Sequence, residues 1–260
     1  MQVYILTLFP GMFSPVMNTS IVKRAQEQGL VRIRPVDIRG FAKDAHKTVD
    51  DYPYGGGPGM VMKPEPVFEA VDWVKQDLGR QPFVVLLTPQ GQKLTAAVAK
   101  QLAEKPDVVL IAGHYEGFDE RIRCLAHMEV SIGDYVLTGG ELAAMVVLDA
   151  SIRFIPGVLG DQDSALQDSF SDGLLEGPQY TRPAEYRRLK VPDILLTGRH
   201  EDIYRWRRKE AIRRTLRRRP ELLRVARLTF EDRCLLEQVI NEEKAGESCS
   251  EARGDIRGHY

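Results

Sequence analysis

The sequence predicts an α/β fold in its first 160 residues, an open and mainly parallel sheet, followed by a small all-α region. The runs Phe83–Leu87 and Val108–Ala112 are continuously apolar, which is typical of strands buried on both faces of a parallel sheet. A helical pattern at about 95–103 lies between them and completes a βαβ unit. The C-terminal third has a helical pattern, clearest at Arg199–Arg219 and Phe230–Glu243.

Further elements complete the α/β region. Val3–Phe9 predicts a strand and Phe13–Gln28 a helix. Residues 31–38 alternate with period two and contain Pro35, so we expect a strand at the edge of the sheet, where proline is tolerated. Gly139–Phe154 is apolar on nearly every side and predicts a buried helix.

Composition then divides the chain into four parts. Residues 160–179 are rich in Asp, Ser and Gly and show no sustained period, which predicts a flexible linker. The expected organisation is an α/β domain at 1–160, the linker at 161–179, a basic helical domain at 180–244 and a disordered tail at 245–260.

The overall composition favours a cytoplasmic protein with no membrane segment. Apolar residues make up 43% and charged residues 28% of the chain, and no apolar run approaches the roughly 18 residues of a membrane span. The N-terminus lacks the features of a signal peptide. The three cysteines, Cys124, Cys234 and Cys249, are too widely spaced for a disulfide framework or a zinc site, so we expect no bound metal from this pattern.

Charge is distributed unevenly along the chain. Residues 1–179 carry 16 Lys/Arg and 23 Asp/Glu, net −7, whereas residues 180–235 carry 17 and 8, net +9. Within Arg199–Arg219 there are 10 basic and 3 acidic residues, with Trp206 among them. A solvated helix face is the ordinary explanation of such a run, but a net charge of +7 in one helix favours contact with a phosphate backbone.

Four glycine-bearing loops predict a ligand pocket built largely from backbone. Three of them follow apolar strands, at 88–91, 113–117 and 132–141, where ligands of open α/β sheets bind. Such a pocket suits an adenine or ribose. The fourth, at 50–60, has four glycines in five positions and could approach a ligand or be a flexible surface turn. It matches neither a P-loop nor a dinucleotide fingerprint.

Individual side chains in these regions permit two interpretations each. Arg153 ends the apolar helix, where a cation is favoured by the helix dipole alone. Asp168 lies in the acidic linker, where most carboxylates are simply solvated. His114 and Glu116 fit a structural pair as well as a functional one. From the residues alone, none of the four has a settled role.

Seven stretches together resemble the bacterial tRNA (guanine-37-N1)-methyltransferases (TrmD family) of the SPOUT class. They occur in the order of that family and cover nearly all of the chain up to the helical region. They are VDDYPYGGGPGMVM (49–62), LTPQGQKL (87–94), IAGHYEGFDER (111–121), SIGDYVLTGGE (131–141), RFIPGVLG (153–160), QDSFSDGLL (167–175) and YTRPAE (180–185).

The resemblance implies a deep trefoil knot at the C-terminal end of the sheet, an exception to the rule that chains avoid knots. It also implies an S-adenosylmethionine pocket formed by the knot loops, a homodimer with active sites at the subunit interface, and a magnesium requirement with no residues assigned to the ion. The implied donor contacts are Pro89, Gly113, Glu116, Ile132, Gly133, Asp134, Tyr135, Val136, Leu137, Gly139 and Gly140.

For catalysis, the resemblance assigns the general base to Asp168 and the charge-stabilising cation to Arg153. Guanine N1 is a poor nucleophile while it holds its proton, so a carboxylate must accept that proton. A guanidinium can donate hydrogen bonds to O6 and N7 as negative charge develops. Because Asp168 lies in the predicted linker, we expect it to be ordered only with RNA bound. His114 stands where some relatives have arginine, and its role stays open.

The expected substrate is guanosine 37 of tRNA, next to the anticodon, and the reaction would support reading-frame maintenance. The expected phosphate contacts are Arg182, Arg207, Arg208, Arg213 and Arg214. Two alternatives remain. One is a related SPOUT enzyme that modifies another RNA position or a ribose 2′-oxygen. The other is a non-catalytic RNA-binding protein that retains the donor, against which the presence of both Asp168 and Arg153 argues.

Overall fold

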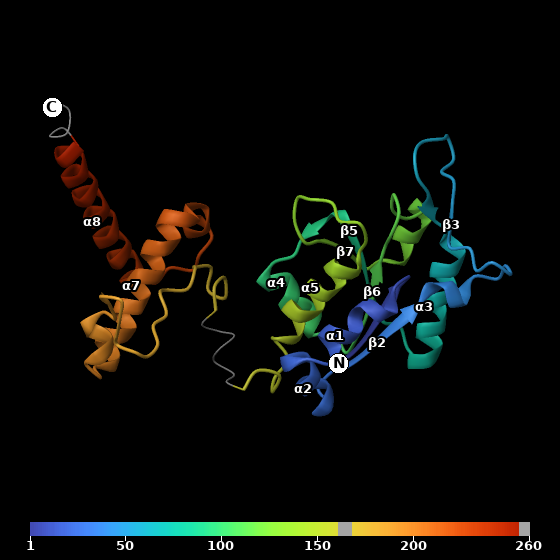
Figure 1. Cartoon of the computed structure of the whole chain (residues 1–260), viewed down its shortest axis with the longest axis horizontal. Coiled ribbons are helices and arrows are strands. Elements are labelled where there is room, and N and C mark those ends of the chain that lie inside the picture. Colours follow the sequence, from blue (N-terminus) through green and yellow to red (C-terminus); the bar gives the residue numbers. More distant parts are fainter. Residues whose placement is uncertain (161–167, 255–260) are drawn as a thin grey trace. The chain divides into compact units, whose positions relative to one another are not determined.

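The computed structural model describes residues 1–160 and 168–254, with side chains as far as residue 245. The chain divides into two compact units, Met1–Gln162 and Asp163–Tyr260. The first is an α/β unit and the second is a helical unit (Figure 1).

The α/β unit is built on a five-stranded sheet in which every pairing is parallel, in the order β2-β1-β6-β5-β7. This confirms the predicted open parallel sheet and the edge position of the proline-containing strand β2. The strands are β1 (Gln2–Thr7), β2 (Arg32–Asp37), β5 (Phe83–Lys93), β6 (Asp107–Ala112) and β7 (Met128–Ser131).

Helices cover both faces of this sheet, as continuous apolar strands require. Alternate side chains of β6 face opposite ways: Leu110 packs in the core beneath α2, α4 and α5, and Ile111 in the core beneath α3. Figure 1 shows α3 on one side of the sheet and the other three helices on the opposite side. These helices are α2 (Ser20–Glu27), α3 (Pro64–Leu78), α4 (Ala96–Ala103) and α5 (Glu141–Ile152).

Helix α3 was not predicted, although its sequence carries a clear helical signal. Its buried residues Val67, Ala70, Val71 and Val74 have the i, i+3, i+4, i+7 spacing of one helix face. A proline occupies its first turn, and Gly79 ends it with a left-handed φ of 67°.

The helix predicted at 13–28 is instead broken into a 3-10 turn (Pro10–Phe13), α1 (Ser14–Met17) and α2. Side chains at the break bind nearby backbone carbonyls. Asn18 Nδ2 donates to the Ser14 carbonyl at 2.8 Å and Thr19 Oγ1 to the Pro15 carbonyl at 2.6 Å. Such local bonds compete with a continuous helix, which a purely apolar pattern does not reveal.

Helix α5 is also less buried than its composition predicts. Ala144, Val147 and Leu148 pack on the sheet, but Leu142 and Val146 are 49% and 45% exposed. Because α5 lies on one face of the sheet, only one side of it can meet the core. The apolar residues on its other side therefore face outward.

The helical unit is held by α7 (His200–Arg218) and α8 (Phe230–Gly254), which pack against each other. Among the described residues its apolar core is small, and a cluster of Leu174, Ile212, Leu235 and Val239 lies at its centre. Two 3-10 turns (Asp193–Leu196 and Pro220–Arg224) and a short hairpin complete the unit. The hairpin strands are β8 (Glu185–Tyr186) and β9 (Leu189–Lys190).

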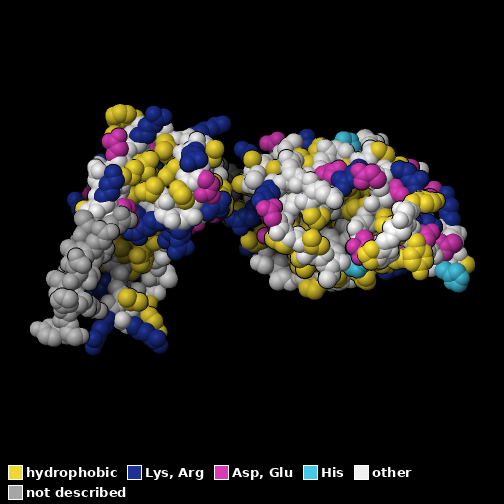
Figure 2. All heavy atoms as spheres, turned by 90° about the horizontal axis from the view of Figure 1, so that it is seen from above, with side chains coloured by type: hydrophobic (Ala, Val, Ile, Leu, Met, Phe, Trp, Pro, Cys, Tyr) yellow, Lys and Arg dark blue, Asp and Glu magenta, His cyan; other side chains and the backbone are white. Residues whose placement is uncertain are grey.

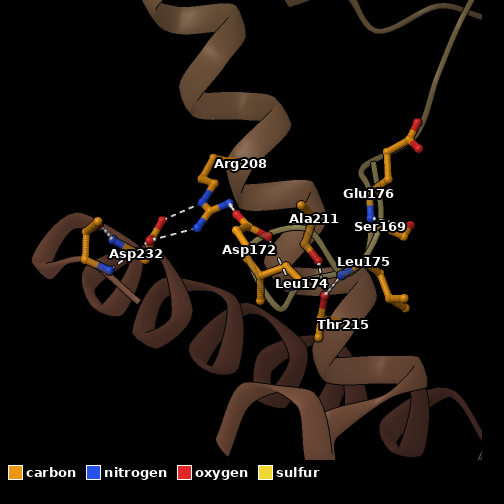
Figure 3. A network of polar contacts seen from close by, with 10 residues as sticks. Ser169, Asp172, Leu174, Leu175, Glu176, Arg208, Ala211, Thr215 and Asp232 are labelled. Carbon is orange, nitrogen blue, oxygen red and sulfur yellow. Dashed lines mark hydrogen bonds and ion pairs between the residues drawn. The ribbon is translucent and has the colours of Figure 1, made fainter. Parts of the chain in front are cut away.

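The segment predicted as a flexible linker is in part a packed component of this helical unit. Leu174 is 2% exposed in its core, and the Leu175 amide donates to Thr215 Oγ1 on α7 at 2.9 Å. Figure 3 shows these residues lying against α7. The linker prediction is therefore wrong for residues 168–179, because the polar composition of the segment outweighed its Leu174–Leu175 pair. Residues 161–167 lie outside the described residues.

Helix α8 likewise continues to Gly254, beyond the predicted start of a disordered tail at 245. The stretch up to Gly254 is helical, and residues 255–260 lie outside the described part. None of the helices in the described residues is long and apolar enough to cross a membrane.

Candidate functional site

A cavity of about 490 Å³ opens at the carboxyl ends of β6 and β7, beside the middle of β5. Loops that follow these strands form its walls, at 113–118 after β6 and at 132–140 after β7, together with Thr88–Gln90 within β5. Ten of the eleven predicted donor contacts line it: Pro89, Gly113, Glu116, Ile132, Gly133, Tyr135, Val136, Leu137, Gly139 and Gly140. The sequence motifs thus converge on one pocket.

Asp134 is the exception. Its side chain is 80% exposed and its carboxylate lies 2.7 Å from Lys93 Nζ. It is absent from the described pocket lining. The prediction that Asp134 contacts the ligand is therefore unsupported by its position, because successive residues of an extended loop point in different directions.

Two glycines fix the floor of the pocket. The Gly140 amide donates to the Gly113 carbonyl at 2.6 Å, joining the loop before α5 to the end of β6. A Cβ on Gly140 would lie 2.7 Å from the Gly113 nitrogen and 2.9 Å from Ala112 Cα. These are backbone atoms of a buried strand and cannot move aside, so only glycine permits this approach.

The wall after β7 is shaped by its own hydrogen bonds. Ser131 Oγ accepts from the Gly133 amide at 3.2 Å and donates to the Gly133 carbonyl at 3.0 Å, which closes a tight turn. Tyr135 folds back over this turn, since its amide donates to the Gly133 carbonyl at 3.0 Å. Apolar side chains such as Ile132 and Leu137 complete the wall. Apolar walls with converging backbone groups fit an adenosine-like ligand.

A buried carboxylate, missed by the sequence analysis, lies behind the pocket. Glu141, at the start of α5, is 2% exposed and accepts a hydrogen bond of 2.8 Å from Thr7 Oγ1 at the end of β1. Its other oxygen is 3.8 Å from His114 Nδ1. His114 packs against Phe9 and Tyr115, with ring centroids 5.0 and 5.2 Å away. The acidic residue in the first helical turn was the available signal.

Two further residues of the pocket, Tyr115 and Arg123, have raised pKa values. Burial raises the pKa of Tyr115, and the nearby Asp50 carboxylate raises it further, so the phenol stays protonated. Arg123 donates to Glu129 and Gln90 and pairs with Glu120 at 2.9 Å, and the Glu129 hydrogen bond is the main reason that its pKa is raised. Arg123 thereby ties three segments of the pocket rim together.

The glycine-rich loop at 50–60 lies next to this site without lining it. It is the tip between β3 (Asp50–Asp51) and β4 (Val61–Met62), and it exposes Tyr52 and Tyr54 almost fully. The Glu116 amide donates to the Met60 carbonyl at 3.0 Å, so the loop borders the 113–118 wall. Its glycines are not among the described residues of the pocket lining, which favours the surface-turn interpretation.

Arg153 and Asp168 belong to different units. Arg153 is the residue that ends α5 and is partly buried in the α/β unit. Asp168, also partly buried, begins the described part of the helical unit, where its carbonyl accepts from the Ser171 amide at 3.2 Å. Neither is among the described residues that line the pocket.

Three of the five predicted phosphate contacts are engaged within the helical unit (Figure 3 for Arg208). Arg208 Nε donates a hydrogen bond of 2.6 Å to Oδ1 of Asp232 on α8, and the same guanidinium also donates to Asp172. Arg213 pairs with Glu210, Glu242 and Glu243, and Arg214 donates to the carbonyls of Glu176 and Gly177 at 3.0 Å. These three side chains therefore have partners within the helical unit that stabilise its fold, and their contact with phosphate stays a prediction.

The other two predicted contacts, Arg182 and Arg207, are exposed. In the described part of the chain neither has an ion pair. Figure 2 shows dark blue basic side chains at several places on the surface of the helical unit. Near Arg207, Trp206 lies 6.4 Å from the exposed Tyr180, measured between ring centroids.

The family model for tRNA (Guanine-1)-methyltransferase TrmD matches residues 1–225. The chain belongs to this family. It is 55% identical over 245 residues to the tRNA (guanine-N(1)-)-methyltransferase of Anoxybacillus flavithermus, covering 94% of this chain and 100% of that protein. It is 59% identical over 224 residues to that of Geobacillus kaustophilus (86% and 91%), and 54% identical over 245 residues to that of Moorella thermoacetica (94% and 98%).

The match to the TrmD family spans the whole α/β unit and most of the helical unit. It therefore includes the pocket, Arg153, Asp168 and helix α7. Among the described residues, no group of three or more His, Cys, Asp or Glu could hold a metal ion. Cys124 and Cys234 are free thiols, one exposed and one partly buried.

Proposed function

We propose that this TrmD-family chain transfers a methyl group from S-adenosylmethionine to N1 of guanosine 37 in tRNA. The observation that carries the proposal is the pocket. Ten residues taken from separate motifs meet in one cavity at the carboxyl end of a parallel sheet. Relatives named tRNA (guanine-N(1)-)-methyltransferase, more than 50% identical over most of the chain, support the same reaction.

The residues of the pocket fit the proposed donor. The close approach at Gly140 and Gly113 leaves main-chain groups at the pocket floor, and Ile132 and Leu137 offer apolar contact for an adenine ring. When bound there, the donor supplies an electrophilic methyl group on a positively charged sulfur. The surrounding loops would hold it in a fixed orientation and exclude water.

Asp168 is the proposed general base. The base must lie within hydrogen-bond reach of guanine N1–H and accept its proton as the methyl group arrives. Arg153 is the proposed stabiliser of the charge that develops on O6, since its guanidinium can donate to O6 and N7 together. Asp168 belongs to the helical unit and Arg153 to the α/β unit, so the proposed proton acceptor and the proposed charge stabiliser come from different units of the fold.

We further propose a homodimer and a trefoil knot, in accord with the SPOUT class. The outward side of α5 supports a subunit interface, since Leu142, Val146 and the neighbouring Met12 are large, apolar and between 43% and 49% exposed. The bond between the Gly140 amide and the Gly113 carbonyl supports a tight chain crossing at the knot.

The proposed tRNA contacts are the exposed Arg182 and Arg207, which have no ion pair in the described residues. Magnesium would act on the RNA or on guanine O6, and no described residue cluster is assigned to it.

The test is a methyl-transfer assay with radiolabelled donor and an unmodified tRNA transcript, followed by identification of the modified nucleoside. We expect 1-methylguanosine at position 37, and none in a transcript with adenosine at that position. A product at another base or on a ribose 2′-oxygen would support the related SPOUT enzyme instead. Tight donor binding without any product would support the non-catalytic alternative.

A further inference from the structure

The hairpin of β8 and β9 has an unusual turn. Its two central residues, Arg187 and Arg188, have φ angles of 51° and 65°. Two positive φ angles in a two-residue hairpin are typical of a type I′ turn, in which Asn-Gly is the favoured pair. Arginine has a Cβ and is strained in this region, so the sequence is poorly suited to its own turn.

The surroundings of the turn do not explain this choice. All six residues from Glu185 to Lys190 are exposed, and the hairpin has only two pairs of facing residues, Glu185 with Lys190 and Tyr186 with Leu189. The guanidinium of Arg187 lies over the Tyr186 ring at 5.3 Å. Among the described residues, no carboxylate pairs with Arg187 or Arg188.

The arginines of α7 give the internal contrast. Arg208, Arg213 and Arg217 each pair with acidic residues of α8. The arginines of the hairpin are exposed instead, and in the described residues neither pairs with a carboxylate, although Arg187 lies over the Tyr186 ring; they occupy a strained turn that a neutral pair would relax. Strain that the local fold does not require is characteristic of a residue kept for contact with a ligand.

We propose that Arg187 and Arg188 form a phosphate-binding tip that contacts the tRNA backbone. This inference rests on the proposed tRNA substrate. A guanidinium donates two parallel hydrogen bonds to a phosphate, and two adjacent ones on a hairpin tip can reach successive phosphates. Tyr186, 60% exposed beside them, offers a surface on which an unpaired base can stack. The tip contributes affinity and not sequence recognition.

The deciding variant is Arg187→Asn with Arg188→Gly, which removes both charges and installs the favoured turn. We expect its melting temperature to stay equal or rise, so a loss of binding cannot come from unfolding. We expect tRNA affinity to fall about tenfold, and the slope of log K against log salt to decrease by about 1 to 2. Affinity is measured by filter binding with an unmodified tRNA transcript at several salt concentrations.

Two controls isolate the tip. Arg187→Lys with Arg188→Lys keeps the charge and the strained turn, and should keep most of the salt slope. Arg24→Gln with Lys100→Gln removes two exposed charges from α2 and α4 of the α/β unit, and should leave affinity nearly unchanged. Wild-type affinity and slope in the Asn-Gly variant would overturn the proposal. A wild-type protein that binds tRNA without methylating it would overturn the proposed function alone, because the tip is tested by binding.

Discussion

The two units of this chain use different physical means to define a site. In the α/β unit the pocket is defined by shape, because glycines such as Gly140 bring backbone within van der Waals distance of a buried strand. In the helical unit the arrangement is defined by charge, because α7 and α8 share a small apolar core in the described residues and are joined by ion pairs. Added volume should therefore damage the first unit, and lost charge the second.

The same contrast divides the proposed reaction. The pocket and Arg153 belong to the α/β unit, and Asp168 and the basic surface belong to the helical unit. Donor binding should therefore be insensitive to changes in the helical unit, whereas proton removal and tRNA binding should depend on it.

The largest effect is expected from Gly140→Val. Its Cβ would meet the Gly113 nitrogen and Ala112 Cα at less than 3 Å, so the loop must move out of the pocket. We expect donor binding and methyl transfer to be lost together, as measured by calorimetry and the tRNA assay. Circular dichroism checks that the variant is folded. A folded variant with wild-type donor affinity would contradict the pocket assignment.

Asp168→Asn should separate the two units. It preserves size and removes the proton acceptor, so we expect methyl transfer to fall by about two orders of magnitude or more while donor affinity is unchanged. Single-turnover rates and calorimetry on the same preparation measure both quantities. Equal rates for variant and wild type at neutral pH would exclude Asp168 as the base.

Arg208→Met tests whether charge holds the helical unit together. The Arg208 side chain is 20% and its partner Asp232 4% exposed, so the substitution leaves a buried carboxylate without its cation. We expect a loss of about 3 kcal/mol in the unfolding free energy of this unit. The matched control is Arg207→Met on the exposed side of the same helix, which should cost less than about 0.5 kcal/mol. Equal urea midpoints for the two variants would refute the comparison.

The smallest effect is a pH dependence of stability. Hydrogen bonds from Arg208 lower the pKa of Asp232, and Lys209 and Arg217 do the same for Glu242 and Glu243. A carboxylate with a lowered pKa stabilises the fold above its unfolded value, near 4, and this contribution is lost as the pH falls through the folded value. The melting temperature should therefore decrease below about pH 4, and less steeply in Arg208→Met. A parallel decrease in both proteins would contradict this assignment.

Much of the α/β unit and its pocket could be predicted because the evidence is local. Continuous apolar runs predict β5 and β6, and the glycine-bearing loops predict a pocket built from backbone at the edge of the sheet. The ten residues that line the cavity came from the resemblance to a family, not from these local patterns. Helix α3 was also predictable from local evidence, because Val67, Ala70, Val71 and Val74 have the spacing of one helix face. The resemblance to a family supplied the roles of Asp168 and Arg153, which the residues alone left open.

The partners of charged side chains were decided only by the tertiary structure. Nothing in the sequence around the arginines of α7 distinguishes those that form ion pairs from those that do not. In the structure Arg207 is exposed, whereas Arg208 forms ion pairs with Asp232, 24 residues away, and with Asp172, 36 residues away. The segment 168–179 gives a second example. Its polar composition predicts a linker, but in the structure Leu174 is buried in the core of the helical unit. Local patterns encode backbone conformation and the side of an element that is buried. Ion pairing depends on which distant segment folds against that side, because Coulomb attraction between exposed charges acts only at short range in water.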